Sequence, residues 1–233
     1  MSNKEGQQKI NPKKVNIKPE SIQATLRESQ KKYVNCVLDN DITFCHGPAG
    51  KSKTFTACYI ALKLLAEKKI KTLILCKPIQ EAGEKLGFLP GDVHEKIDPY
   101  MESYVSNMQK IIGPETTQKL IDAEIIQFKP LAFMRGDTYD NALMILDEAQ
   151  NSHWKQLILF ITRMGKNSKV IVTGDIHQYD IAKDKVSFYK FINLFKHIDG
   201  ITEHEFTEKD IVRSKILQKV VKVYENWKNK NDL

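Results

Sequence analysis

The sequence predicts an α/β fold, in which a mostly parallel β-sheet is flanked by helices on both faces. Short apolar runs typical of strands alternate with stretches of helical periodicity along the 233 residues, and this alternation is typical of βαβ units. Strands are expected at 42–45 and 71–76 with a helix at 55–65 between them, which implies parallel pairing. The length suits one sizeable core, so we expect a single domain over 19–233 after a polar, disordered leader at 1–18.

The composition favours a cytoplasmic protein with an anionic partner. No unbroken apolar run reaches the roughly 18 residues that a membrane-spanning helix needs, and the polar N-terminal segment lacks the apolar stretch of a signal peptide. The cysteines lie singly in apolar segments without metal-ligand spacing, so we interpret them as buried thiols: Cys36, Cys45, Cys58 and Cys76. The net charge of +7 and pI near 9.0 suit nucleic acid, although a solvated lysine-rich surface explains them equally well.

The stretch between the first strand and its helix has the residue types of a phosphate-binding loop. It reads His46-Gly47-Pro48-Ala49-Gly50-Lys51-Ser52-Lys53-Thr54. Backbone N–H groups of such a turn and of the helix start attract phosphate oxygens. We expect Lys53 to reach the β- and γ-phosphates and the Thr54 hydroxyl to ligate Mg²⁺. The pattern has glycine where this chain has Ser52. A strained φ at this serine would cost on the order of 1 kcal/mol, whereas a helical φ would cost almost nothing.

The other elements follow from hydrophobic periodicity and from breaks in it. Helices are expected at 21–40, at 92–122 with a division at Gly113-Pro114, and at 154–163, 187–198 and 210–227; further strands are expected at 123–128, 141–146, 168–175 and 201–206. The loop at 77–92 leaves the carboxyl end of a strand, where ligands bind to parallel sheets, although an ordinary surface connection is the alternative. We interpret Phe188, Phe191 and Phe195 as core residues and not as a base-stacking surface.

Two adjacent carboxylates follow the apolar strand at 141–146. Bare charge is costly at the end of a buried strand unless a cation lies near. The pair Asp147-Glu148 therefore predicts a Walker B arrangement, in which Asp147 holds Mg²⁺ and Glu148 orients and deprotonates the attacking water. A strand that merely stops at a polar turn is the alternative, and the phosphate-binding loop earlier in the chain argues against it.

Further blocks accompany these two motifs. With the two motifs included, the blocks in chain order are Gly47-Pro48-Ala49-Gly50, residues 81–91, Arg135-Gly136, Asp147-Glu148-Ala149-Gln150-Asn151, residues 162–165, Ser168-Lys169, Thr173-Gly174-Asp175 with Gln178, and Asp210-Ile211-Val212-Arg213. Over 19–227 the chain resembles the PhoH-like family of P-loop ATPases, in the short form often carried by bacteriophages. That family is similar in its core to superfamily 1 helicases.

The resemblance implies further roles for single residues. Gln30 matches the position of an adenine-reading glutamine, although a solvated helix glutamine is the alternative. Gln178 matches a γ-phosphate sensor, and Asp175 lies beside the Mg²⁺ and water network. Arg213 matches a charge-compensating arginine, and Arg135 is a second phosphate-binding candidate; a structural ion pair is the alternative for both.

The resemblance also implies the activity and the partners. We expect hydrolysis of ATP with Mg²⁺, coupled to nucleic acid, with RNA favoured over DNA, in a helicase-like motor that forms a homo-oligomer, by analogy a hexamer. Many relatives have an arginine where this chain has Asp137, which inverts the charge there. One alternative is a small-molecule or nucleotide kinase, which the water-activating Glu148 disfavours. The other is a nucleic-acid-binding module with weak or no hydrolysis, which Ser52 favours.

Overall fold

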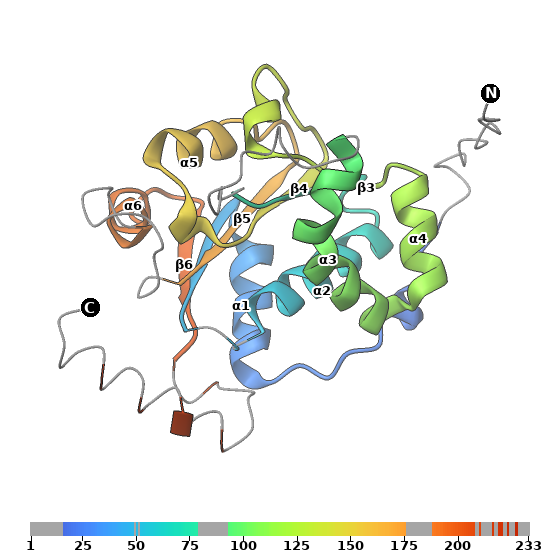
Figure 1. Cartoon of the computed structure of the whole chain (residues 1–233), viewed down its shortest axis with the longest axis horizontal. Coiled ribbons are helices and arrows are strands. Elements are labelled where there is room, and N and C mark those ends of the chain that lie inside the picture. Colours follow the sequence, from blue (N-terminus) through green and yellow to red (C-terminus); the bar gives the residue numbers. More distant parts are fainter. Residues whose placement is uncertain are drawn as a thin grey trace.

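A six-stranded parallel sheet forms the centre of the protein (Figure 1). The computed structural model describes residues 16–48, 50, 52–78, 93–175, 188–207, 210, 216, 219, 220, 223 and 227, with 93–100 described by their backbone alone. The strands are β1 (Ile42–His46), β2 (Thr72–Cys76), β3 (Ile126–Phe128), β4 (Ala142–Leu146), β5 (Lys169–Gly174) and β6 (Ile201–Glu205). Their order across the sheet is β3-β2-β4-β5-β1-β6. The predicted α/β fold with a parallel sheet is therefore confirmed.

The strands that carry the motifs are neighbours, although they are far apart in the sequence. Strand β5 pairs with β1 from Ile42–Val170 to His46–Gly174 and with β4 up to Leu146–Val172. The βαβ unit predicted from β1 and β2 does exist, but β5 and β4 lie between its two strands. The carboxyl ends of β4, β5 and β1 thus meet at one edge of the sheet.

Helices cover both faces of the sheet (Figure 1). They are α1 (Glu28–Asp39), α2 (Lys53–Ala66), α3 (Val93–Ile112), α4 (Pro114–Asp122), α5 (Trp154–Ile161) and α6 (Phe188–Phe195), with short 3₁₀ turns η2 (Pro19–Ser21), η4 (Leu131–Met134) and η5 (Ala149–Asn151). Strand side chains alternate between two apolar clusters, as a period of two requires. Leu73 and Leu75 of β2 belong to the cluster under α1 to α4, whereas Ile74 and Cys76 belong to the cluster with α5 and α6.

The first predicted helix is wrong in its boundary. Helix α1 begins at Glu28 and not near residue 21, because the Gln30 side chain accepts a hydrogen bond from the Arg27 backbone N–H (2.9 Å) and so stabilises a start at this point. Ile22 and Leu26 precede the helix and still pack against the core, which explains their apolar spacing. Ile17, within the segment predicted to be a leader, is buried with 4% exposure, so the folded part extends upstream of Pro19.

The other predicted elements agree with the structure to within a few residues. Gly113 and Pro114 separate α3 from α4 as predicted, and β3 is shorter than expected. Phe188 and Phe191 are buried in the core. Residues 79–92 of the predicted loop, residues 176–187 and most of the predicted helix 210–227 lie outside the described residues, while residues 216, 219, 220, 223 and 227 are helical.

The cysteines are free thiols, as predicted. Three of them are buried, whereas Cys36 is only half-buried. Burial raises the pKa of Cys45, Cys58 and Cys76, so these three thiols are protonated at neutral pH. Nowhere in the described chain is there a helix with the length and hydrophobicity to cross a bilayer.

Candidate nucleotide-binding site

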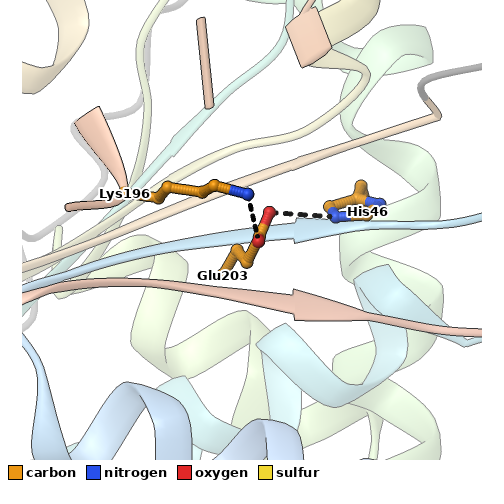
Figure 2. A network of polar contacts seen from close by, with 3 residues as sticks. All are labelled: His46, Lys196 and Glu203. Atoms are coloured by element: carbon orange, nitrogen blue, oxygen red, sulfur yellow. Dashed lines mark hydrogen bonds and ion pairs between the residues drawn. The ribbon is translucent and has the colours of Figure 1, made fainter. Parts of the chain in front are cut away.

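The candidate site lies at the carboxyl edge of the sheet, where β1 runs into the loop that precedes α2. The last residue of β1, His46, is 4% exposed. Figure 2 shows its Nε2 atom facing Glu203 Oε2 on β6 (3.6 Å), while Glu203 Oε1 accepts a hydrogen bond from Lys196 Nζ (2.8 Å) directly after α6. This hydrogen bond raises the pKa of Lys196. The network joins the base of the loop to the neighbouring strand and to the end of α6.

The first glycine of the loop is required by its surroundings. Gly47 has φ +136°, and a Cβ added there would lie 2.3 Å from the carbonyl oxygen of Phe206. Any L-residue at this position would have both the dihedral strain and this steric contact. Gly50 also has a positive φ of 80°. Ala49 and Lys51, predicted members of the loop, lie outside the described residues.

Lys53 points back into the loop from the first turn of α2. Its ammonium donates to the carbonyl oxygens of Gly47 (2.6 Å) and Pro48 (3.1 Å). These carbonyls hold the charge at the place where the motif predicts phosphate, and a lysine carries further donors for an anion. The predicted reach of Lys53 to the β- and γ-phosphates stays a prediction.

Ser52 occupies a left-handed conformation, with φ 63° and ψ 28°. Of the two possibilities that the sequence left open, the structure has the strained one, because an L-residue in this region crowds its Cβ against the backbone. The Ser52 side chain makes no capping hydrogen bond to α2. Its carbonyl accepts hydrogen bonds from the Thr56 N–H (2.9 Å) and hydroxyl (2.8 Å). Serine therefore adopts the backbone that glycine usually provides in this motif.

The two motifs meet through a direct hydrogen bond between Thr54 and Asp147. The Thr54 hydroxyl donates to Asp147 Oδ2 (2.7 Å) across 93 residues of sequence. The other oxygen, Oδ1, accepts from the hydroxyl of Thr173 at the end of β5 and from the Glu148 N–H (3.0 Å). Asp147 is 3% exposed. A nearly buried carboxylate is thus held by hydroxyl and amide donors from β4, β5 and α2.

These groups suit a hard divalent cation. Carboxylate and hydroxyl oxygens are the ligands that Mg²⁺ prefers, and in the described part of the chain no lysine or arginine forms an ion pair with Asp147. The negative charge of Asp147 acts on its surroundings: burial first, and then this carboxylate, raise the pKa of the Tyr104 hydroxyl. Thr54 and Asp147 therefore fit the metal role predicted for them.

Glu148 projects from the strand end into solvent. It has φ 56°, a left-handed conformation that turns the chain sharply after Asp147, and its side chain is exposed. Its Oε2 accepts a hydrogen bond from Gln150 Nε2 (2.7 Å). The exposed Glu148 carboxylate, next to the buried Asp147, can reach a water molecule, as a general base must.

Gln30 is not a solvated helix residue, since it is only 6% exposed. Its Nε2 donates to the Thr56 hydroxyl (2.9 Å), and its Oε1 accepts from the Arg27 N–H (2.9 Å). The amide thus lies against α2, one turn after the loop. It retains one N–H and one lone pair for a ligand.

Arg135 lies apart from these contacts. It follows η4, and its exposed side chain makes no hydrogen bond or ion pair with any other residue that the structure describes. The neighbouring Asp137 accepts a hydrogen bond from the Tyr139 hydroxyl (2.8 Å), and its carbonyl accepts from Arg163 (3.1 Å). In this chain Asp137 stabilises the turn before β4.

Two residues near the site were missed as functional residues by the sequence analysis. Thr173 and Gln150 both contact the carboxylate pair. Their signal in the sequence was their place at and just after strand ends. Gln150 reaches Glu148 within the same turn, whereas only the pairing of β4 with β5 brings Thr173 to Asp147. Gln178 and Arg213 lie outside the described residues, so their roles stay predictions.

Comparison with known proteins finds similarity to PhoH-like proteins. The family model described as PhoH-like protein matches residues 22–225. A PhoH-like protein of Bacillus subtilis is 41% identical over 211 residues, which are 90% of this chain and 66% of the relative. A PhoH-like protein of Synechocystis is 40% identical over 86% of this chain and 61% of its own length. Protein PhoH of Escherichia coli is 34% identical over 84% of this chain and 56% of its own length. The chain thus spans 56–66% of the lengths of these curated relatives.

A solved structure is similar at greater distance. The Pif1 helicase from Candida albicans matches 79% of this chain and 41% of its own, with a TM-score of 0.41 and 15% identity. A match with this TM-score and identity supports no statement about the function of this chain.

Proposed function

Because this chain belongs to the PhoH-like protein family, we propose that it binds and hydrolyses ATP with Mg²⁺ and couples hydrolysis to nucleic acid. The observation that carries the proposal is the hydrogen bond between Thr54 and Asp147 (2.7 Å). It joins a phosphate-binding loop to a carboxylate pair at the edge of the sheet where ligands of α/β proteins bind.

We propose the following roles within the site, which its geometry supports. The N–H groups of the loop and of the start of α2 bind phosphate oxygens. Lys53 exchanges one of its two carbonyl partners for phosphate. Thr54 and Asp147 hold Mg²⁺, which when bound neutralises phosphate charge. Glu148 takes a proton from the attacking water, the bond from the γ-phosphorus to the bridging oxygen breaks, and ADP leaves. The transferring phosphoryl group is stabilised by charge and not by covalent chemistry.

The remaining residues complete the proposed site. Gln30 binds adenine through its second amide hydrogen and second lone pair. Gln178 senses the γ-phosphate, with Asp175 beside the water network, and Arg213 compensates charge on the transferring group. Arg135 binds phosphate or nucleic acid, which its exposure and the absence of an ion pair among the described residues favour.

The partner is nucleic acid, with RNA favoured over DNA. The net charge of +7 and the pI near 9.0 support this part of the proposal. A helicase-like motor of this size needs a second copy to hold a strand while it moves, so the proposal includes a homo-oligomer, a hexamer by analogy. The cytoplasmic location, the single domain over 19–233 and the short bacteriophage-type form stay predictions.

The test is Mg²⁺-dependent phosphate release from ATP by the whole chain, with single-stranded RNA, with single-stranded DNA and without either. We expect Lys53→Ala and Glu148→Gln to reduce turnover at least about a hundredfold, as loss of a phosphate ligand or a general base does. The matched controls are Lys119→Ala and Glu115→Gln. These two residues form an exposed ion pair on α4 (2.7 Å) away from the site, so turnover should stay unchanged.

Each alternative predicts a different result. A nucleic-acid-binding module predicts no release above the Glu148→Gln background. A kinase predicts release only when an acceptor other than water is added. Equal turnover in RNA, DNA and buffer would contradict coupling to nucleic acid while leaving ATP hydrolysis in place.

A further inference from the structure

The side chain of Gln150 joins the ends of two strands at the candidate site. Its Nε2 donates to Glu148 Oε2 (2.7 Å), and its Oε1 accepts from the backbone N–H of Asp175 (2.9 Å). Glu148 follows β4 and Asp175 follows β5. One amide therefore spans the gap between the two neighbouring strands.

The chemistry of the partners determines the orientation of this amide. A carboxylate only accepts and a backbone N–H only donates. The Gln150 oxygen must therefore face Asp175, and its nitrogen must face Glu148. With the opposite orientation both hydrogen bonds would be lost. Any side chain that holds both partners at once needs a donor and an acceptor on the same planar group.

The surroundings of Gln150 hold it in place. Ala149 is fully buried, and the Asn151 N–H donates to the Glu148 carbonyl (3.0 Å), which closes the turn η5. A Cβ added to Gly174 would lie 2.8 Å from Gln150 Oε1 and 2.9 Å from the ring of Phe188. The glycine at the end of β5 thus leaves the space that the amide occupies.

We propose that Gln150 is a positioning residue that holds the Glu148 carboxylate for water activation. An exposed glutamate samples several rotamers, whereas the amide hydrogen bond selects one and leaves Oε1 of Glu148 for the water. This inference rests on the proposed function, because it assigns Glu148 the role of general base. The bond to Asp175 anchors the amide to the end of β5. Because β5 is the neighbour of β1, this bond holds Glu148 in place relative to the phosphate-binding loop.

Two substitutions separate the two hydrogen bonds. Gln150→Ala removes both. Gln150→Glu keeps an acceptor for the Asp175 N–H, but it loses the donor to Glu148 and brings a like charge beside it. If Gln150 acts through Glu148, both variants lower kcat about tenfold or more, as loss of a hydrogen bond to a charged group does. KM for ATP and Kd for a non-hydrolysable analogue stay within about twofold, because the nucleotide contacts are unchanged.

A purely structural role predicts another pattern. If Gln150 only joined β4 to β5 through Asp175, Gln150→Glu would turn over like the wild type, and that result would overturn the inference. The matched control is Gln118→Ala on α4. Gln118 Nε2 makes the same kind of bond to a carboxylate, Asp122 Oδ1 (2.8 Å), on an exposed surface, so kcat should not change.

A double-mutant cycle completes the test. In a Glu148→Gln background the residual rate should not fall further with Gln150→Ala, because the group that Gln150 positions is already absent. A further tenfold loss in that background would overturn the inference. A wild-type chain without phosphate release would overturn the proposed function and this inference together. Normal Glu148-dependent turnover in both Gln150 variants would overturn this inference alone.

Discussion

Replacement of Ser52 by glycine should stabilise the protein. Ser52 lies at φ 63° and ψ 28°, where an L-residue is disfavoured by roughly 1–2 kcal/mol. Glycine removes this strain. It also makes the unfolded chain more flexible, which offsets about 0.4–1 kcal/mol. The balance is a net gain of about 1 kcal/mol or less, which for a chain of this size raises the midpoint of thermal unfolding by about 1–4 °C.

No contact that the structure describes is lost in this change. The Ser52 side chain makes no capping hydrogen bond, and the two hydrogen bonds from Thr56 go to the Ser52 backbone carbonyl. The backbone path of the loop is therefore the same with glycine, and we expect ATP turnover by Ser52→Gly to equal or exceed that of the wild type.

Calorimetry of the wild type, Ser52→Gly and Ser52→Ala tests this reasoning. Ser52→Ala keeps the Cβ and removes the hydroxyl, so its midpoint should match that of the wild type. A midpoint of Ser52→Gly at or below that of the wild type would show that the left-handed conformation carries no net penalty. A loss in Ser52→Ala would show that the hydroxyl contributes contacts of its own.

Three further substitutions test other parts of the structure. Lys169→Met removes an ammonium that donates to the carbonyls of Leu38 (3.0 Å) and Asn40 (2.6 Å) at the end of α1. We expect the free energy of unfolding, measured in urea, to fall by about 1–3 kcal/mol. An unchanged free energy of unfolding would show that these two hydrogen bonds do not stabilise the helix end. Gly47→Ala places a Cβ 2.3 Å from a backbone oxygen at φ +136°. We expect the free energy of unfolding to fall by more than about 2 kcal/mol. A midpoint of urea unfolding equal to that of the wild type would exclude the clash. Burial lowers the pKa of His204 from 6.5, so the unfolded chain takes up this proton first and stability falls as the pH drops through and below about 6.5. In urea titrations between about pH 7 and pH 5, the free energy of unfolding should fall less steeply with pH in His204→Phe than in the wild type. The same pH dependence in both proteins would contradict this prediction.

The strand, loop and helix around the phosphate-binding motif are predictable from sequence, because their signals are local. The apolar run before Gly47 and the helical periodicity after Lys53 lie within about twenty residues, and β1 and α2 follow them. Asp147 and Glu148 are likewise visible as charges at the end of an apolar run. Side-chain type and period were sufficient for these assignments.

Other features depend on neighbours that are distant in sequence. The start of α1 at Glu28 depends on Gln30, whose amide binds both its own helix start and Thr56 of α2. Periodicity alone placed the start too early, because Ile22 and Leu26 pack against the core without being helical. A pattern of burial does not separate a helix from a packed extended segment.

The sequence by itself determined the parallel α/β fold, the residues of the phosphate-binding loop and the carboxylate pair, because each is encoded in a short run of residues. Only the tertiary structure decided the strand order, which brings Thr173 against Asp147 and the Asp175 N–H against Gln150. It also decided the conformation of Ser52, where the turn between β1 and α2 imposes a left-handed backbone on an L-residue. Strand order and loop dihedrals depend on packing between distant segments, and no local pattern contains that information.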